Sequence, residues 1–177
     1  MAGGAPVNLT PDHPADDTHQ RYTPDGKGII YRSDRNGDSL LQVYAADLVR
    51  DASGQVTGIA NERPLTKNAH VNWCPYYHPD GRHFVYGTSE VGHQNYEVFM
   101  RDAKHPEAAV RITECAGADV LPAFSHDGKW MIWTAQRGTD DTGGGKPSSQ
   151  VWAARFDIHA ASAKAPVSTA SAAGHAP

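Results

Sequence analysis

The residues best suited to chemistry in this chain are its histidines, of which there are ten. His70 and His93 lie in segments expected to be loops, and Glu90 or Asp119 could add a carboxylate to them. Two imidazoles with one carboxylate are a common ligand set for a divalent transition metal. However, the sequence contains no compact His-x-His or His-Glu-x-x-His spacing. Because histidines scattered over loops are usually solvated or hydrogen-bonded, we predict no metal site and no cofactor.

Nucleophilic catalysis has little support in the pattern of serines and cysteines. The sequence has no Gly-x-Ser-x-Gly motif. Cys74 stands near His70 and His78, but it falls in a segment expected to be a buried strand. A reactive thiol needs an exposed, electropositive setting. Residues 143–146 (GGGK) lack the spacing of a phosphate-binding loop. We therefore predict no catalytic residue.

Three segments of the chain repeat one pattern, which is the strongest signal in the sequence. Each has an aromatic residue, a Pro-Asp-Gly turn followed by a basic residue, and then an apolar stretch, although His126 replaces the proline in the third copy. Proline presets the φ of the second turn position and glycine accepts a positive φ, so the turn reverses the chain between two strands. The copies begin at Tyr22, Tyr77 and Phe124.

The repeat also predicts the strands around each turn. A mostly apolar strand follows the turn at residues 28–33, 83–88 and 130–135, as expected when neighbouring sheets cover both faces. A third strand carries Gln-Val or Glu-Val, and a fourth ends in Leu-Thr or Ile-Thr. Leu9-Thr10 is a further copy of this fourth element. The insertions fall at turns, namely residues 49–55, read as an extended hairpin loop, and the Gly-rich residues 138–145.

Four short strands per unit of about 40–45 residues are the signature of a β-propeller blade, whose apolar faces are covered by neighbouring blades. We predict an all-β chain with three four-stranded antiparallel blades within residues 1–157. The blades are residues 17–66, 67–113 and 114–157; residues 7–10 form an orphan outer strand, and no outer strand follows the inner three of the third blade. Residues 158–177, rich in Ala, Ser and Pro, are expected to be a disordered tail, with a short Ala-rich helix as the alternative.

Composition sets limits on partners and compartment. The formal net charge is -4 with both signs interspersed, so neither nucleic acid nor an anionic membrane is an expected partner. No apolar run reaches the roughly 18 residues of a membrane span. The first six residues lack the basic start and apolar core of a secretion signal. Cys74 and Cys115 are expected to be unpaired thiols, with a bridge between them left open for an oxidising compartment.

Residues 22–37 (YTPDGKGIIYRSDRNG) and 124–138 resemble the WD-like Pro-Asp-Gly repeats of TolB-like propellers. The resemblance covers residues 7–157 and implies a six-bladed propeller, periplasmic or exported, that binds other proteins. The same repeat occurs in propellers attached to serine peptidases and in oligogalacturonate lyases. The chain departs from the family at His126 and in having three blades where the family has about six.

The chain begins with an orphan outer strand and ends with a blade that lacks its outer strand, and this arrangement suggests a homodimer. Two chains could close a six-bladed ring in which each gives residues 7–10 to the third blade of the other, which would remove the exposed sheet edges. A stable monomer in solution would count against this arrangement.

Propellers usually bind ligands at the face where loops converge around the channel. Our first interpretation is a non-catalytic TolB-like scaffold that binds a protein partner through this face or the channel mouth. The alternatives are a metal-dependent lyase of acidic sugars and an accessory propeller domain of a serine peptidase. The repeat places polar residues from all three blades on that face, and the predicted binding residues are Asp17, His19, His70, Asn72, Glu90, His93, Asn95 and Asp119.

Overall fold

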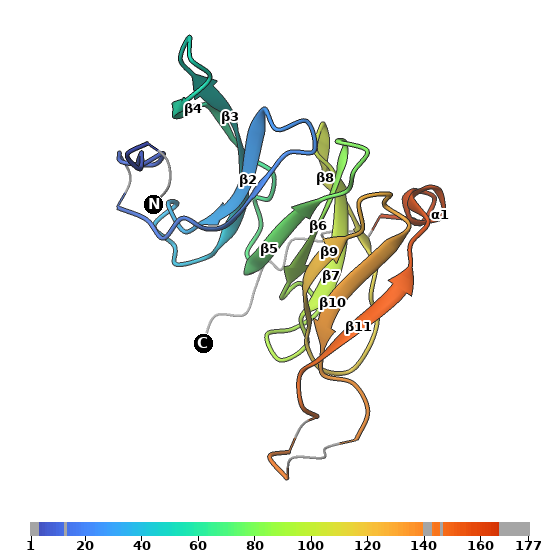
Figure 1. Ribbon diagram of the computed structural model, residues 1–177. Coiled ribbons are helices and arrows are strands. Elements are labelled where there is room, and N and C mark those ends of the chain that lie inside the picture. Colours follow the sequence, from blue (N-terminus) through green and yellow to red (C-terminus); the bar gives the residue numbers. More distant parts are fainter. Residues whose placement is uncertain (1–3, 13, 140–142, 146, 167–177) are drawn as a thin grey trace.

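The computed structural model describes residues 4–12, 14–139, 143–145 and 147–166, and its strands form three antiparallel sheets that stack side by side (Figure 1). The first sheet has the strands β1 (Thr18–Tyr22), β2 (Gly28–Ser33), β3 (Gln42–Arg50) and β4 (Val56–Pro64), in that order. The second has β5 (Asn72–Tyr77), β6 (His83–Thr88), β7 (Glu97–Asp102) and β8 (His105–Arg111). The third has β9 (Asp119–Phe124), β10 (Trp130–Ala135) and β11 (Gln150–Arg155).

This arrangement confirms the predicted all-β fold of consecutive propeller blades. Each sheet is a meander in which neighbouring strands in sequence are neighbours in space. The third sheet has three strands in the described part of the chain, so the fourth strand that a complete blade would have is missing from it. Among the described residues, β11 is therefore a free edge.

The equivalence of the three repeats extends to the register of the strands. The aromatic positions that recur in the sequence pair directly across the second and third strands of each sheet: Tyr31 with Tyr44, Tyr86 with Phe99, and Trp133 with Trp152. Because opposite residues of neighbouring strands share a face, each sheet presents one aromatic pair on the same side. This side faces the preceding sheet in the second and third blades.

Apolar side chains between the sheets form the core. Between the first and second sheets, Ile30 and Val43 pack with Phe84 and Tyr86, and all four are almost fully buried. Between the second and third sheets the same positions recur, with Val85 and Val98 of the second sheet packing against Met131 and Trp133 of the third. Since the second sheet contributes to both interfaces, apolar residues occupy both faces of its central strands, which explains their nearly continuous hydrophobic sequence.

The insertion at residues 49–55, expected as an extended hairpin loop, does lengthen a hairpin: β3 runs on to Arg50, β4 begins at Val56, and residues 51–55 join them. Two expected strand positions differ from the structure. The outer strands β4 and β8 end just before the Leu-Thr and Ile-Thr motifs, whereas the sequence places these motifs at the ends of the strands. β-branched residues at 56, 57 and 59 favour extended backbone there.

Residues 7–10 do not form the predicted outer strand. The segment is irregular, and Leu9 packs against the free side of the first sheet with Ile29, Tyr31 and Tyr44. The expected pairing site is β11, which lies at the opposite end of the row of sheets in Figure 1. A strand needs a neighbour to complete its backbone hydrogen bonds, so this segment cannot be one within a single chain.

The tail was predicted to be disordered from residue 158, and this is wrong at its start. α1 (Ile158–Ser162) is a short helix capped by Asp157, whose carboxylate accepts hydrogen bonds from the backbone N–H groups of His159 and Ala160. Ala161 is buried in the core between the second and third sheets, which explains why the segment is ordered. In the described part of the chain, no helix combines the length and the apolar character of a membrane span. Residues 167–177 lie outside the described part.

Candidate binding site at the channel

The innermost strand of each sheet has the same irregularity. His19 in β1, Cys74 in β5 and Leu121 in β9 have φ of 56°, 50° and 56°, and each lies where the pairing with the next strand shifts register. A left-handed conformation is uncommon for residues other than glycine, and such strain often marks functional sites. These equivalent bulges line the axis of the propeller with side chains that ordinary strands would direct elsewhere.

The three left-handed residues meet around a small cavity. It has a volume of about 70 Å³, and its lining also includes Arg21, Pro75, Tyr76, Pro122 and Ala123. Cys74 Sγ lies 3.4 Å from His19 Nδ1, so a thiol of the second blade contacts an imidazole of the first. The sequence suggested only His70 or His78 as neighbours of Cys74, and both suggestions are wrong.

Electrostatics keep this cysteine–histidine pair neutral. Burial raises the pKa of the Cys74 thiol to about 11, although Arg32 and Arg21 act in the opposite direction. Burial and the same two arginines lower the pKa of His19. A catalytic thiolate–imidazolium pair needs the reverse shift for the thiol, because the thiolate is the nucleophile. The geometry therefore resembles a catalytic pair, but the charge states do not.

We expect Cys74 to resist alkylation at neutral pH. With a pKa of about 11, the thiolate fraction at pH 8 is on the order of one in a thousand. Labelling by iodoacetamide, located by peptide mass spectrometry, should therefore modify Cys74 at least about 100-fold more slowly than a free thiol and accelerate as the pH approaches 11. In the Cys74→Ser variant, the labelling of Cys115 should be the same as in wild type. Rapid modification of Cys74 at pH 7 would contradict this assignment.

A larger, open depression lies at the end of the channel where the Pro-Asp-Gly turns gather. Its volume is about 440 Å³. Arg21 and Tyr76 line both this depression and the small cavity, so the two are adjacent. The side chain of Tyr22 is 66% exposed. The complete lining is Arg21, Tyr22, Pro24, Tyr76, Tyr77, Pro79, Phe124, Ser125 and His126.

The sequence interpretation missed these lining residues, although a signal for them was present. Each copy of the repeat has an aromatic residue just before its turn, and these three aromatics come together as Tyr22, Tyr77 and Phe124. In the sequence these aromatics stand out only as part of the turn motif. Because the first strands converge on the axis, residues at their ends must lie close together at one mouth of the channel.

Most of the predicted binding residues lie at the other end of the inner strands. Asp17 and Asp119 occupy the same position in the first and third blades, and each pairs with an arginine at the end of the second strand. Arg35 Nη2 lies 3.1 Å from Asp17, and Arg137 contacts Asp119. Burial opposes ionisation of Asp17, but hydrogen bonds from Ser33, Thr10 and Arg35 outweigh it, so its pKa is lowered. These carboxylates hold loops within their own blade.

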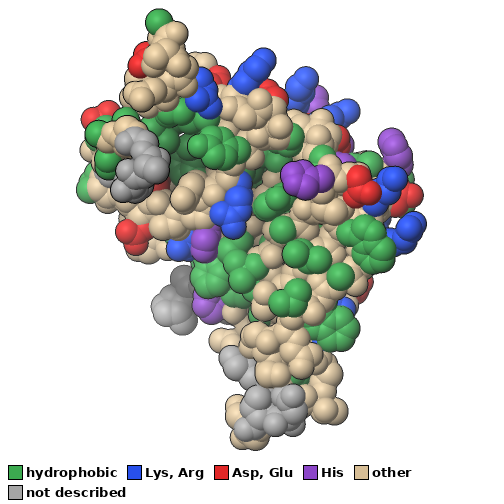
Figure 2. All heavy atoms as spheres, viewed as in Figure 1, with side chains coloured by type: hydrophobic (Ala, Val, Ile, Leu, Met, Phe, Trp, Pro, Cys, Tyr) green, Lys and Arg blue, Asp and Glu red, His purple; other side chains and the backbone are tan. Residues whose placement is uncertain are grey.

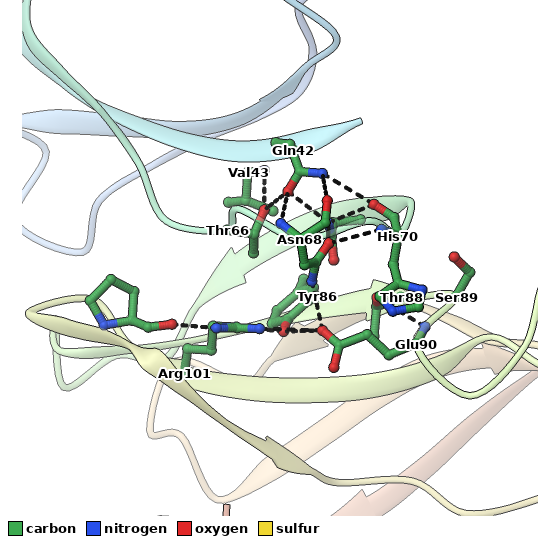
Figure 3. Close-up of polar contacts among 12 residues, drawn as sticks. Gln42, Val43, Thr66, Asn68, His70, Tyr86, Thr88, Ser89, Glu90 and Arg101 are labelled. Carbon is green, nitrogen blue, oxygen red and sulfur yellow. Dashed lines mark hydrogen bonds and ion pairs between the residues drawn. The ribbon is translucent and has the colours of Figure 1, made fainter. Parts of the chain in front are cut away.

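In the second blade the equivalent positions are Asn72 and Glu90, so the ion pair is replaced. Glu90 pairs instead with Arg101 from β7, at 3.2 Å, and accepts a hydrogen bond from Asn68 Nδ2 at 2.8 Å. Figure 3 shows Arg101 between the carboxylate of Glu90 and a backbone carbonyl, beside the ring of Tyr86. The side chains of Glu90 and Arg101 are nearly buried.

Asn72 belongs to a network that joins the first blade to the second. Its Nδ2 donates to Gln42 Oε1 at 3.0 Å, and Gln42 Nε2 donates to the backbone carbonyls of Asn68 and His70 (Figure 3). Asn72 is fully buried, as is Asp119 in the next blade. The side chain of Asn72 therefore helps to position the connection between the first two blades, and neither Asn72 nor Asp119 contributes to an exposed rim.

The remaining predicted residues are dispersed. His19 points into the channel against Cys74. His93 is exposed, with Nδ1 3.4 Å from the Tyr96 hydroxyl, and His70 and Asn95 are partly buried. Their role in binding stays a prediction.

The described residues form neither a cluster of metal ligands nor a disulfide. Within the described ranges, no group of three or more His, Cys, Asp or Glu side chains is placed to hold a metal ion. Cys74 and Cys115 are both free thiols in the structure.

Known structures resemble this fold. The chain matches TolB from Acinetobacter baumannii with a TM-score of 0.60 and 26% identity, over 81% of this chain and 31% of that one. It matches a putative TolB from Agrobacterium tumefaciens with a TM-score of 0.58 and 20% identity, over 85% of this chain and 61% of that one. The chain is a TolB-like propeller segment. No protein-family model and no curated protein matches its sequence.

A third structure shows the same fold in another context. Prolyl oligopeptidase B from Galerina marginata, bound to a macrocyclization substrate, matches with a TM-score of 0.53 and 14% identity, over 86% of this chain and 23% of that one. At this identity the match shows the fold alone. The TolB-like chain thus spans about a third to three fifths of the two TolB structures and under a quarter of the peptidase.

Proposed function

We propose that this TolB-like segment is a protein-binding scaffold, and that its partner docks in the depression at the Pro-Asp-Gly mouth of the channel. The observation that carries the proposal is the lining of this depression, where the exposed Tyr22 and Arg21 stand beside the partly buried Tyr76. Tyrosine and arginine are the side chains most often found at the energetic centre of protein interfaces. The depression is open to solvent and has a volume of about 440 Å³.

The neutral state of the nearest potential nucleophile supports binding over catalysis. Cys74 is the thiol closest to the channel, and burial raises its pKa to about 11. The left-handed residues in the inner strands of all three blades give the channel wall the same local shape in each blade. Binding sites built on strands are more rigid than binding sites on loops. We include in the proposal the periplasmic or extracellular compartment that the resemblance to TolB-like repeats implies.

Selection of peptides from a random display library on the immobilised protein tests the proposal. We expect selected peptides to bind wild type in isothermal titration and to lose affinity by roughly 30-fold with Tyr22→Ala, as for a central aromatic contact worth about 2 kcal/mol. Tyr22→Phe should retain most of the affinity because it keeps the ring.

The matched control for this selection is an exposed apolar residue elsewhere. Val91 lies in the loop between β6 and β7, at the other end of the inner strands, and is 41% exposed. Val91→Ala should leave peptide affinity within about twofold, since it is outside the proposed contact. Equal binding by wild type and Tyr22→Ala would refute the depression as the docking site.

The structure bears differently on the two alternative functions, a metal-dependent lyase and an accessory domain of a peptidase. The lyase interpretation calls for a cluster of metal ligands, and none is found among the residues described here. The peptidase-accessory interpretation has a solved counterpart in prolyl oligopeptidase B, but only at the level of the fold. Neither has a specific residue of this chain in its favour.

A further inference from the structure

The sequence pair Leu-Thr closes the outer side of the first sheet in a specific way. The N–H of Val43 in β3 donates to Thr66 Oγ1 at 2.8 Å, and the N–H of Leu65 donates to the carbonyl of Val43 at 2.7 Å. Thr66 Oγ1 in turn donates to Gln42 Oε1 at 2.8 Å. Gln42-Val43 on the third strand and Leu65-Thr66 beside it therefore form one recognition unit.

The second sheet repeats this unit with the equivalent residues. The N–H of Val98 donates to Thr113 Oγ1 at 2.9 Å, and the N–H of Ile112 donates to the carbonyl of Val98 at 2.8 Å. The hydroxyl of Thr113 also bonds Glu97. A Gln-Val or Glu-Val pair on the third strand thus binds a Leu-Thr or Ile-Thr pair in both complete sheets.

The third sheet has the first half of the unit without the second. Gln150-Val151 begins β11, but no described strand lies on the outer side of β11. Val151 is 78% exposed, whereas Val43 and Val98 are fully buried. One half-unit is therefore unoccupied in the described part of the chain.

The opposite half-unit is present at the start of the described residues. Leu9-Thr10 repeats the Leu-Thr pair, and it stands at the right distance from the sheet that follows. Thr66 precedes Asn72 by six residues, Thr113 precedes Asp119 by six, and Thr10 precedes Asp17 by seven. In both complete cases the pair binds the sheet before the strand that it leads into.

The faces of the end sheets show the same complementarity. Ile132 in β10 is 47% exposed, although Ile30 and Val85 at the same position are fully buried by the aromatic face of the next sheet. Figure 2 shows hydrophobic side chains gathered over the third sheet. An aromatic face of that kind, with Tyr31 and Tyr44, has no neighbouring sheet among the described residues at the other end of the row. The side chains of Leu9, Leu48 and Ile59 pack against it.

We propose that the missing neighbour is a second copy of this chain. In the resulting dimer, Leu9-Thr10 of each copy binds Gln150-Val151 of the other, and the exposed face of each third sheet packs on the first sheet of the partner. Leu9 already lies against that first sheet, next to the position that the partner's β11 would take. The half-channels of the two chains, each with its depression, would together form the channel of a closed six-bladed ring.

The oligomeric state of the full chain tests this inference. Size-exclusion chromatography with light scattering should give twice the 19.1 kDa of one chain. Val151→Lys should reduce the mass to that of the monomer, because the position becomes fully buried on pairing. Val49→Lys is the matched control: Val49 is also an exposed valine on a strand, but it lies at the tip of the β3–β4 hairpin and should leave the dimer intact.

A second pair of variants tests the hydrogen bond itself. Thr10→Val should raise the dimer dissociation constant about tenfold, because the N–H of Val151 would lose its acceptor. Thr10→Ser keeps the hydroxyl and should dimerise like wild type. Circular dichroism confirms that every variant is folded. A wild-type monomer at all concentrations, or equal masses for Val151→Lys and wild type, would overturn the proposal without affecting the peptide-binding proposal.

Discussion

Replacing Arg101 with methionine should lower the free energy of unfolding by about 3–5 kcal/mol, the usual cost of leaving one partner of a buried ion pair alone. Arg101 is 5% exposed and pairs with Glu90 at 3.2 Å. Its Nε donates to the Tyr86 hydroxyl at 2.6 Å, and its guanidinium also donates to the backbone carbonyl of Pro106. Methionine fills a similar volume but supplies none of these donors, so the carboxylate of Glu90 would be buried without a counter-charge. Urea unfolding followed by fluorescence measures the change.

The control for Arg101 is an arginine whose ion pair is at the surface. Arg82 pairs with Asp102 and is more than half exposed, so Arg82→Met should cost less than about 1 kcal/mol. The double variant Arg101→Met with Glu90→Gln should recover part of the loss, since the amide removes the buried charge. A cost below 1 kcal/mol for Arg101→Met alone would show that Glu90 finds other partners.

Local repetition explains why the architecture could be predicted from the sequence. The Pro-Asp-Gly turns and the apolar strands after them are determined by neighbouring residues, and three copies reinforce one another. The recurring aromatics at 31, 86 and 133 even gave the correct cross-strand equivalence. The free edge at β11 followed from the same alignment.

The candidate site was harder to predict because it depends on contacts between distant segments. His19 and Cys74 are 55 residues apart, and they meet only because both inner strands bulge at that point. The burial of carboxylates expected at the polar rim was hard to predict for a related reason. A carboxylate at 17 or 119 looks exposed in a loop, but an arginine 18 residues later folds back onto it. In the second blade, Glu90 takes the arginine's place.

The pairing of aspartate with arginine could have been inferred by aligning the three repeats of the sequence. Aspartate and arginine recur together in the first and third repeats, and both change in the second, to Asn72 and Glu90. A coordinated change of both members is typical of residues in contact. The pairing of Glu90 with Arg101, by contrast, has no counterpart in the other repeats, so the sequence offered no signal for it.

Substituting Gly128 with alanine should have the second-largest effect, a loss of about 2–5 kcal/mol. Gly128 has φ of +69°, where a side chain costs about 1–2 kcal/mol. A Cβ there would also overlap the His78 ring, with Cε1 only 2.8 Å away. His78 cannot yield easily, because its ring packs against Phe124 with centroids 4.8 Å apart and its Nε2 lies 3.3 Å from the Gly128 carbonyl. Overpacking of this kind adds about 1–3 kcal/mol.

The repeat supplies a matched control that separates the two costs. Gly81 occupies the same turn position in the second blade with φ of +70°, but nothing lies within 4 Å of a Cβ built on it. Gly81→Ala should therefore cost only the backbone term of about 1–2 kcal/mol. Thermal and urea unfolding of both variants measure the difference, which reports the contact between the turns of the second and third blades. If the two variants were equally destabilised, the close packing of His78 on Gly128 would be wrong, and with it the tight stacking of these two blades at the mouth of the channel.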